Sequence, residues 1–142
     1  MRFDDARARI VELEQQLADA SKGIVRTGRI HRLRTWPEGF RAICDGRKTH
    51  EVRRDDRGFV AGDELVLEEW DPSRLEELRR TERERAFDRA YTGRSAIALI
   101  TYVTPAATWG LPDDRCVLSI RLVEVHGVTN EDVAAAEERG AA

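Results

Sequence analysis

Apolar residues recur along the chain at two spacings, one typical of helices and one typical of strands. Near the N-terminus, apolar side chains three and four positions apart predict a helix over residues 4–20. Its apolar stripe consists of Phe3, Ala6, Ile10, Leu13, Leu17 and Ala20. Such a narrow a/d-like stripe either packs on its own domain or pairs with a second copy of the chain, and we favour a homodimer contact.

Further along, shorter apolar runs bounded by turn residues predict strands. These runs cover residues 24–34 (interrupted by Gly28), 48–54, 64–70, 94–103 and 116–125. In the third run, Leu65 and Leu67 alternate with other residue types, the pattern of a strand with one buried face.

A Thr-Trp-Pro-Glu sequence at 35–38 predicts the start of a short helix between the first two strands. Thr35 is expected to cap this helix, and Glu38 is expected to reach back to the cap. Gly46 is expected to end it. The residues that share one face of the helix, and are therefore expected in the core, are Trp36, Phe40 and Ile43.

The remaining pattern favours a small α+β domain. Residues 72–90 are rich in Arg and Glu, and we predict a solvated helical insertion between two strands. Several short strands, one early helix and no βαβ alternation in the pattern indicate a small mixed barrel. We therefore divide the chain into an N-terminal helix (1–23), a domain (24–126) and a C-terminal tail or helix (127–142).

Length and composition narrow the class of protein. The chain has 142 residues, 41% of them hydrophobic, which suits a single domain with its own core. No apolar run approaches the roughly 20 residues of a membrane helix, and the first residues do not resemble a secretory signal. Cys44 and Cys116 lack metal-binding spacing. We expect a soluble, cytoplasmic protein with no membrane partner, no metal and no cofactor.

Charge is unevenly distributed, although the formal net charge is only −3. Residues 22–57 carry eleven basic and five acidic side chains, a local charge of +6. The overall balance does not suit tight duplex binding, whereas the basic segment can guide a single strand or a nucleotide phosphate, or simply form a solvated face. Among 24 basic residues only Lys22 and Lys48 are lysine, and a buried lysine, unlike arginine, can give up its proton.

Lys48 falls in Gly46-Arg47-Lys48-Thr49-His50-Glu51-Val52-Arg53, which fits the pattern GxKxxExR. Lys48 and Glu51 are candidate catalytic residues, as base or nucleophile and as proton carrier, and Arg53 can bind a phosphate or carboxylate. Glu51 and Arg53 share a strand face. Lys48 can join them only from the turn before the strand becomes regular. The alternative is a set of ion pairs that stabilises the strand.

The GxKxxExR motif marks the ASCH domains of the PUA-like superfamily, which this chain resembles. The surrounding residues resemble the phage and bacterial branch catalogued as domain of unknown function 3850. They are His31-Arg32-Leu33-Arg34-Thr35-Trp36-Pro37-Glu38, Phe40, Asp56-Arg57, Phe59, Gly62-Asp63, Leu65, Tyr91-Thr92-Gly93-Arg94, Gly110-Leu111 and the strand 117–120. The resemblance implies a PUA-like β-barrel of about five to six strands with a cleft beside the motif.

The resemblance also implies a choice of functions. PUA-like domains commonly bind RNA or modified bases, so our first hypothesis is binding of RNA, a nucleotide or a modified nucleoside. Other ASCH proteins are amidohydrolases on acetylated cytidine or look like nucleases. This chain has Glu51 where those amidohydrolases have threonine, and residues 104–114 show no counterpart of their further glutamate. A third hypothesis is a phage interaction protein without catalysis.

Four further residues are candidates for ligand contact. His31 suits acid–base chemistry or a nucleotide contact, or is a barrel-edge histidine with its own partner. Trp109 can stack on a base, or serve as a core or lid residue. Arg57 and Arg94 can contact phosphate, with surface salt bridges as the alternative.

Overall fold

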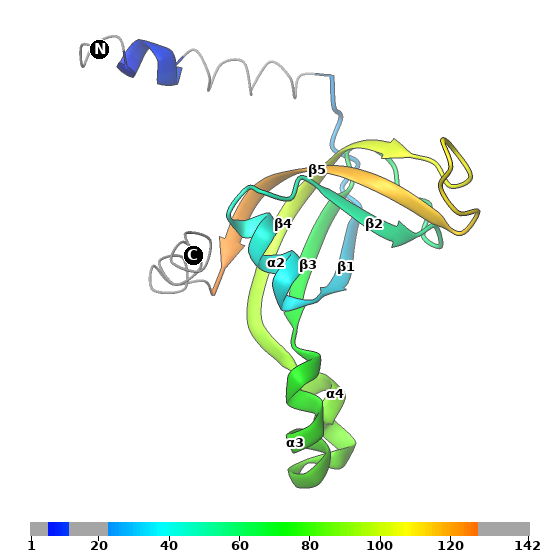
Figure 1. Ribbon diagram of the computed structural model, residues 1–142. Helices are drawn as coiled ribbons and strands as arrows, with labels where there is room; N and C mark the ends of the chain where they lie inside the picture. Colours follow the sequence, from blue (N-terminus) through cyan, green and yellow to red (C-terminus); the bar gives the residue numbers. More distant parts are fainter. Residues whose placement is uncertain (1–5, 12–22, 128–142) are drawn as a thin grey trace.

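The computed structural model describes residues 6–11 and 23–127, and five β-strands and three short α-helices lie within residues 23–127 (Figure 1). The strands are β1 (Ile30–Thr35), β2 (His50–Arg54), β3 (Glu64–Trp70), β4 (Tyr91–Thr104) and β5 (Arg115–His126). The helices are α2 (Pro37–Cys44), α3 (Leu75–Thr81) and α4 (Ala86–Arg89), with 3₁₀ turns η1 (Pro72–Arg74) and η2 (Arg83–Arg85). Residues 6–11 are also helical.

The strands form one sheet in the order β1-β3-β4-β5-β2. β1 pairs with β3 in parallel, and the other neighbours are antiparallel. The sheet curls into a half-barrel, and α2 lies on its concave side (Figure 1). This arrangement confirms the α+β class and is consistent with a small PUA-like barrel.

Alternating side chains build the core on the concave face. Leu65 and Leu67 are fully buried, as their alternation predicts. From α2, Phe40 and Ile43 pack into the same cluster, which continues across β4 and β5 to residues such as Leu118. This packing anchors α2 against the sheet and thereby places the loop before β2.

The start of α2 corrects two expectations. Trp36, not Thr35, is the N-cap residue, and no side chain caps the helix. Thr35 is instead the last of the buried, inward-facing residues of β1. Trp36 has an extended backbone (φ −68°, ψ 152°) and is 62% exposed, so it is not a core residue. It continues the strand alternation, and the helical spacing begins only at Pro37.

The predicted strands otherwise match closely, except for the first. β1 begins at Ile30 rather than at residue 24. Gly28 has a positive φ of 79°, and the preceding segment is held by a hydrogen bond from Thr27 N to Gly62 O instead of a strand ladder. A left-handed glycine interrupts the regular pleat, so pairing starts after it.

Residues 71–90 form a helical protrusion that extends away from the sheet beyond the ends of β3 and β4 (Figure 1). It corresponds to the charged segment predicted to be helical. Two aromatic residues attach the protrusion to the sheet. Trp70 Nε1 donates a 2.8 Å hydrogen bond to Phe87 O, and the two rings lie 5.1 Å apart. The protrusion therefore begins beside the end of β1, because Thr35 pairs with Glu69.

Several predictions fall on residues outside the described ranges. Of the predicted N-terminal helix, residues 6–11 are described as helical, with Ile10 and Val11 more than half exposed. The remainder of its apolar stripe and the predicted C-terminal helix lie outside the described residues. Within the described ranges, no helix is both long and apolar enough to cross a bilayer.

Candidate functional site: a basic cleft between the two sheet edges

A cleft of about 530 Å³ opens where the end of β1, the first turn of α2 and the start of β2 meet. Its lining consists of Leu33, Arg34, Thr35, Trp36, Gly39, Lys48, Glu51, Arg53 and Arg57. β1 and β2 are the two edges of the sheet, and its curl brings them to the same cleft. The cleft thus combines two stretches of sequence, residues 33–39 and 48–57.

Glu51 is the centre of a charged cluster at the base of this cleft. Its side chain is 3% exposed, and both carboxylate oxygens accept hydrogen bonds. Lys48 Nζ donates to Oε1 at 2.6 Å. Arg53 Nε lies 2.8 Å from Oε2 and Arg53 Nη2 lies 2.7 Å from the same oxygen. A buried carboxylate is thus matched by two cations, as its burial requires.

Lys48 reaches this cluster from the turn that precedes β2, as the strand geometry requires. β2 begins at His50, and the backbone N–H of Lys48 still donates to Ala42 O of α2 at 3.0 Å. The amine lies over the first turn of α2, 3.8 Å from the point where a Cβ on Gly39 would stand. The Lys48 side chain is 28% exposed and lines the cleft.

Arg53 bridges the two edges of the half-barrel. In addition to its ion pair with Glu51, it donates to Arg34 O at 3.0 Å and to Thr35 Oγ1 at 3.1 Å, both in β1. Arg57 adds a second bridge by donating to Arg32 O at 3.0 Å. These bonds satisfy β1 carbonyl groups that have no partner strand on that side.

Trp36 gives the cleft its aromatic surface. It lines the cleft and keeps 62% of its surface accessible. An exposed indole beside several cations is typical of sites that hold a flat, anionic ligand.

Comparison with known proteins shows which family the chain belongs to. A family profile described as "Domain of unknown function (DUF3850)" matches residues 30–120. The chain belongs to this family. It is also similar to an uncharacterized 12.9 kDa protein in the GpA 3′ region of Escherichia phage P2, at 30% identity over 81 residues. That match covers 57% of this chain and 60% of the phage protein.

In this DUF3850 domain, His31 lies away from the cleft lining. It is buried, its Nε2 is 2.8 Å from Asp63 Oδ2, and its ring packs edge-on against Phe59. Burial alone would raise the pKa of Asp63. Hydrogen bonds from Thr27, His31 and Val60 and the Arg29 charge outweigh it, so the pKa of Asp63 is lowered. His31 is thus part of a buried network that links β1 to Asp63, the residue that precedes β3.

Two other candidates also lie apart from the cleft lining. Arg94 is paired with the buried Glu69, with Nε and Nη2 at 2.6 and 2.5 Å from Oε1, and Thr92 donates to the same oxygen. Trp109 stands 83% exposed in the loop between β4 and β5, with a positive φ of 51°. The structure therefore brings together Lys48, Glu51, Arg53 and Arg57 of the predicted set.

The described residues offer no evident metal or thiolate site. No group of three His, Cys, Asp or Glu side chains gathers in the described ranges. Burial, with smaller contributions from Glu69 and Asp45 against Arg94, raises the pKa of Cys44 to about 11. Burial also raises the pKa of Cys116. Neither free thiol is therefore poised as a nucleophile.

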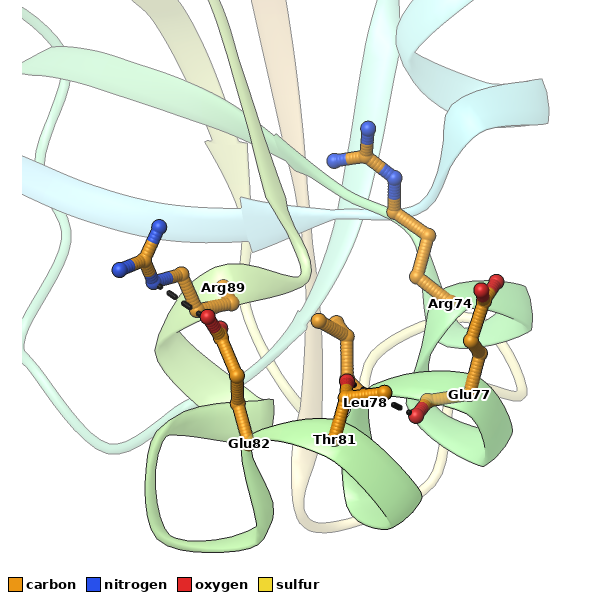
Figure 2. A pocket seen from close by; sticks show the side chains of 6 residues that line it. All are labelled: Arg74, Glu77, Leu78, Thr81, Glu82 and Arg89. Carbon is orange, nitrogen blue, oxygen red and sulfur yellow. Dashed lines mark hydrogen bonds and ion pairs between the residues drawn. The ribbon is translucent and has the colours of Figure 1, made fainter.

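A second hollow, of about 460 Å³, lies on the helical protrusion (Figure 2). It presents two arginines and two glutamates, and one pair, Arg89 Nε and Glu82 Oε2, lies 3.3 Å apart. The other polar contact in Figure 2 is the hydroxyl of Thr81 donating to Glu77 O at 3.2 Å. Its charges are balanced and its side chains are ordinary helix-surface residues, so the cleft is the better candidate.

Five cleft residues were not predicted as site residues, and Arg34 and Trp36 are the two of them that offer a charge or an exposed aromatic ring. The signal that identifies them is the alternation that runs through Leu33, Arg34, Thr35 and Trp36. If the strand alternation is continued through residue 36, the indole of Trp36 falls on the outward face, outside the core.

Proposed function

We propose that the cleft binds a nucleotide or a short stretch of single-stranded RNA. The observation that carries this proposal is the exposed Trp36 in the same cleft as Lys48, Arg53 and Arg57. Stacking on an indole suits any base, while cations beside it attract phosphate. The resemblance to PUA-like domains, which commonly bind RNA or modified bases, points to the same ligand class.

The charge of the cleft supports an anionic ligand. Its lining holds four cations and one carboxylate, a net charge of +3, within a chain whose net charge is −3. Because the remainder of the protein is acidic, a polyanion is attracted locally to this cleft rather than to the whole surface.

The arrangement of Glu51 favours binding over hydrolysis. Both of its oxygens accept bonds from cations, so its carboxylate already serves to hold Lys48 and Arg53. In binding, the same contacts hold the two cations in place at the base of the cleft.

The proposal is tested with Trp36→Ala. Because Trp36 is mostly exposed, we expect the melting temperature to stay within about one or two degrees. Loss of one stacked base should weaken binding by about 1–3 kcal/mol, or roughly fivefold to 150-fold. The measurement is fluorescence anisotropy with labelled hexaribonucleotides, together with calorimetry for the four ribonucleoside 5′-monophosphates.

Tyr102→Ala is the matched control, because Tyr102 is a 54% exposed aromatic residue on β4 outside the cleft lining. It should bind as the unmodified protein does. Equal affinity of Trp36→Ala and Tyr102→Ala, or no binding by the unmodified protein to any of these ligands, would contradict the proposal.

A further inference from the structure

Arg34 differs from the other cations of the cleft in how its side chain is engaged. Lys48 and Arg53 are paired with Glu51, and Arg57 donates to Arg32 O. Among the residues that the structure describes, Arg34 forms no ion pair and its guanidinium donates no hydrogen bond. Its charge and its N–H groups therefore remain available to a ligand.

The Arg34 guanidinium is nevertheless held in place by two aromatic rings. Its Cζ lies 4.6 Å from the ring centroid of Trp70 and 4.9 Å from that of Phe87. The Trp70 ring is bonded through Nε1 to the backbone carbonyl of Phe87, and the two rings lie 5.1 Å apart. Cation–π contact orients a guanidinium without using its hydrogen-bond donors.

Phe87 belongs to the helical protrusion, whereas Trp70 ends β3 and Arg34 lies in β1. The protrusion thus contributes to the cleft by placing the Phe87 ring against Arg34, a residue of the cleft lining. Phe87 remains 49% exposed, which is unusual for a large aromatic side chain that only fills a core.

We infer that Arg34 is the phosphate-binding residue of the cleft and that Phe87 and Trp70 are positioning residues for it. This inference rests on the proposed function and specifies its ligand as a nucleotide carrying a phosphate, not a nucleoside. A guanidinium with free N–H groups binds two phosphate oxygens at once, and a fixed orientation lowers the entropy lost in doing so. The phosphate is either that of a mononucleotide or one within a strand.

The test compares nucleosides with their phosphates by calorimetry. The probes are the four ribonucleosides, their 5′- and 3′-monophosphates, and the dinucleotide CpC, which has one internal phosphate. We expect the unmodified protein to prefer a phosphate-bearing probe over the nucleoside by about tenfold to a hundredfold. A preference for a monophosphate indicates a mononucleotide ligand, and a preference for CpC indicates a strand.

Arg34→Ala should abolish this preference, because it weakens binding of the phosphate-bearing probes more than binding of the nucleosides, and Arg34→Lys should restore only part of it because lysine lacks the planar fork. Phe87→Leu, which keeps an apolar side chain but removes the ring, should reduce the preference. Arg32→Ala is the matched control: Arg32 lies two residues earlier on the same face of β1, paired with Glu68 and outside the cleft lining. It should keep the full preference.

Equal affinity for nucleosides and phosphates, or a preference that survives in Arg34→Ala, overturns this inference and leaves the proposed function in place. Loss of preference in Arg32→Ala as large as that in Arg34→Ala also overturns it, because the effect is then one of general charge. If the unmodified protein binds none of the probes and no hexaribonucleotide, both the inference and the proposed function fail.

Discussion

Replacing Glu51 by glutamine should lower the stability of the fold and raise the affinity of the cleft for anions. Glu51 is the buried acceptor of two hydrogen bonds, from Lys48 Nζ at 2.6 Å and from Arg53 Nε at 2.8 Å, and Arg53 Nη2 lies 2.7 Å from Oε2 as well. Glutamine has nearly the same shape, but it offers one acceptor oxygen, and its NH₂ group then faces a cation. The substitution thus removes the charge without creating a cavity.

The size of the stability loss follows from burial. Removing one partner of a fully buried ion pair costs about 3–5 kcal/mol. Here Lys48 and Arg53 remain 28% and 21% exposed, so water can solvate them once the carboxylate is gone. We therefore expect a loss of about 2–3 kcal/mol. At about 4 °C per kcal/mol, a value suited to a domain of this size, the melting temperature should fall by about 8–12 °C.

Binding should change in the opposite direction, because the cleft lining then carries a net charge of +4 instead of +3. The assays are thermal unfolding followed by circular dichroism, and hexaribonucleotide binding measured below the melting transition at two salt concentrations. Glu38→Gln is the control, since Glu38 is exposed in the first turn of α2 and does not line the cleft. An unchanged melting temperature for Glu51→Gln, or weaker RNA binding, would refute this reasoning.

The same variant separates binding from hydrolysis. If the protein cleaves acetylated cytidine or labelled RNA and Glu51→Gln loses that turnover while binding more tightly, Glu51 acts as a proton carrier. We expect no turnover by the unmodified protein, because both Glu51 oxygens are already engaged.

Four further predictions concern the rest of the chain. Gly62→Ala should lower stability by about 2 kcal/mol or more in thermal unfolding, since φ is +99° and a Cβ would lie 2.0 Å from Val25 O. The pKa of Asp63 is lowered in the fold, so its contribution to stability is present at neutral pH and lost below about pH 4; Asp63→Asn should reduce the acid sensitivity of unfolding. Cys44, whose pKa is about 11, should react with thiol reagents slowly at pH 8 and faster only as the pH approaches that value. Removal of residues 1–23 should halve the mass measured by light scattering if the N-terminal helix is the dimer contact, and an unchanged mass excludes it.

The regular elements were predictable because their signals are local. The alternation around Leu65 and Leu67 and the helical spacing of Phe40 and Ile43 each lie within one short window of sequence. Strand parity also gave the route by which Lys48 could meet Glu51, since an odd separation requires the amine to come from the turn before β2, and the structure has it there. The errors fell at a boundary, where Trp36 was assigned to the helix although it continues the strand.

The amino-acid sequence was therefore sufficient for the elements, for the buried faces of most of them and for the charged motif at the start of β2. The cleft was not predictable in the same way, because it depends on the curl that brings β1 and β2, the two edges of the sheet, together. Arg53 contacts residues 18 and 19 positions earlier, and Arg34 meets Phe87 of the helical protrusion across the end of β3. Such contacts have no period along the chain. They arise from the twist and closure of the whole sheet, which the packing of α2 on its concave face stabilises.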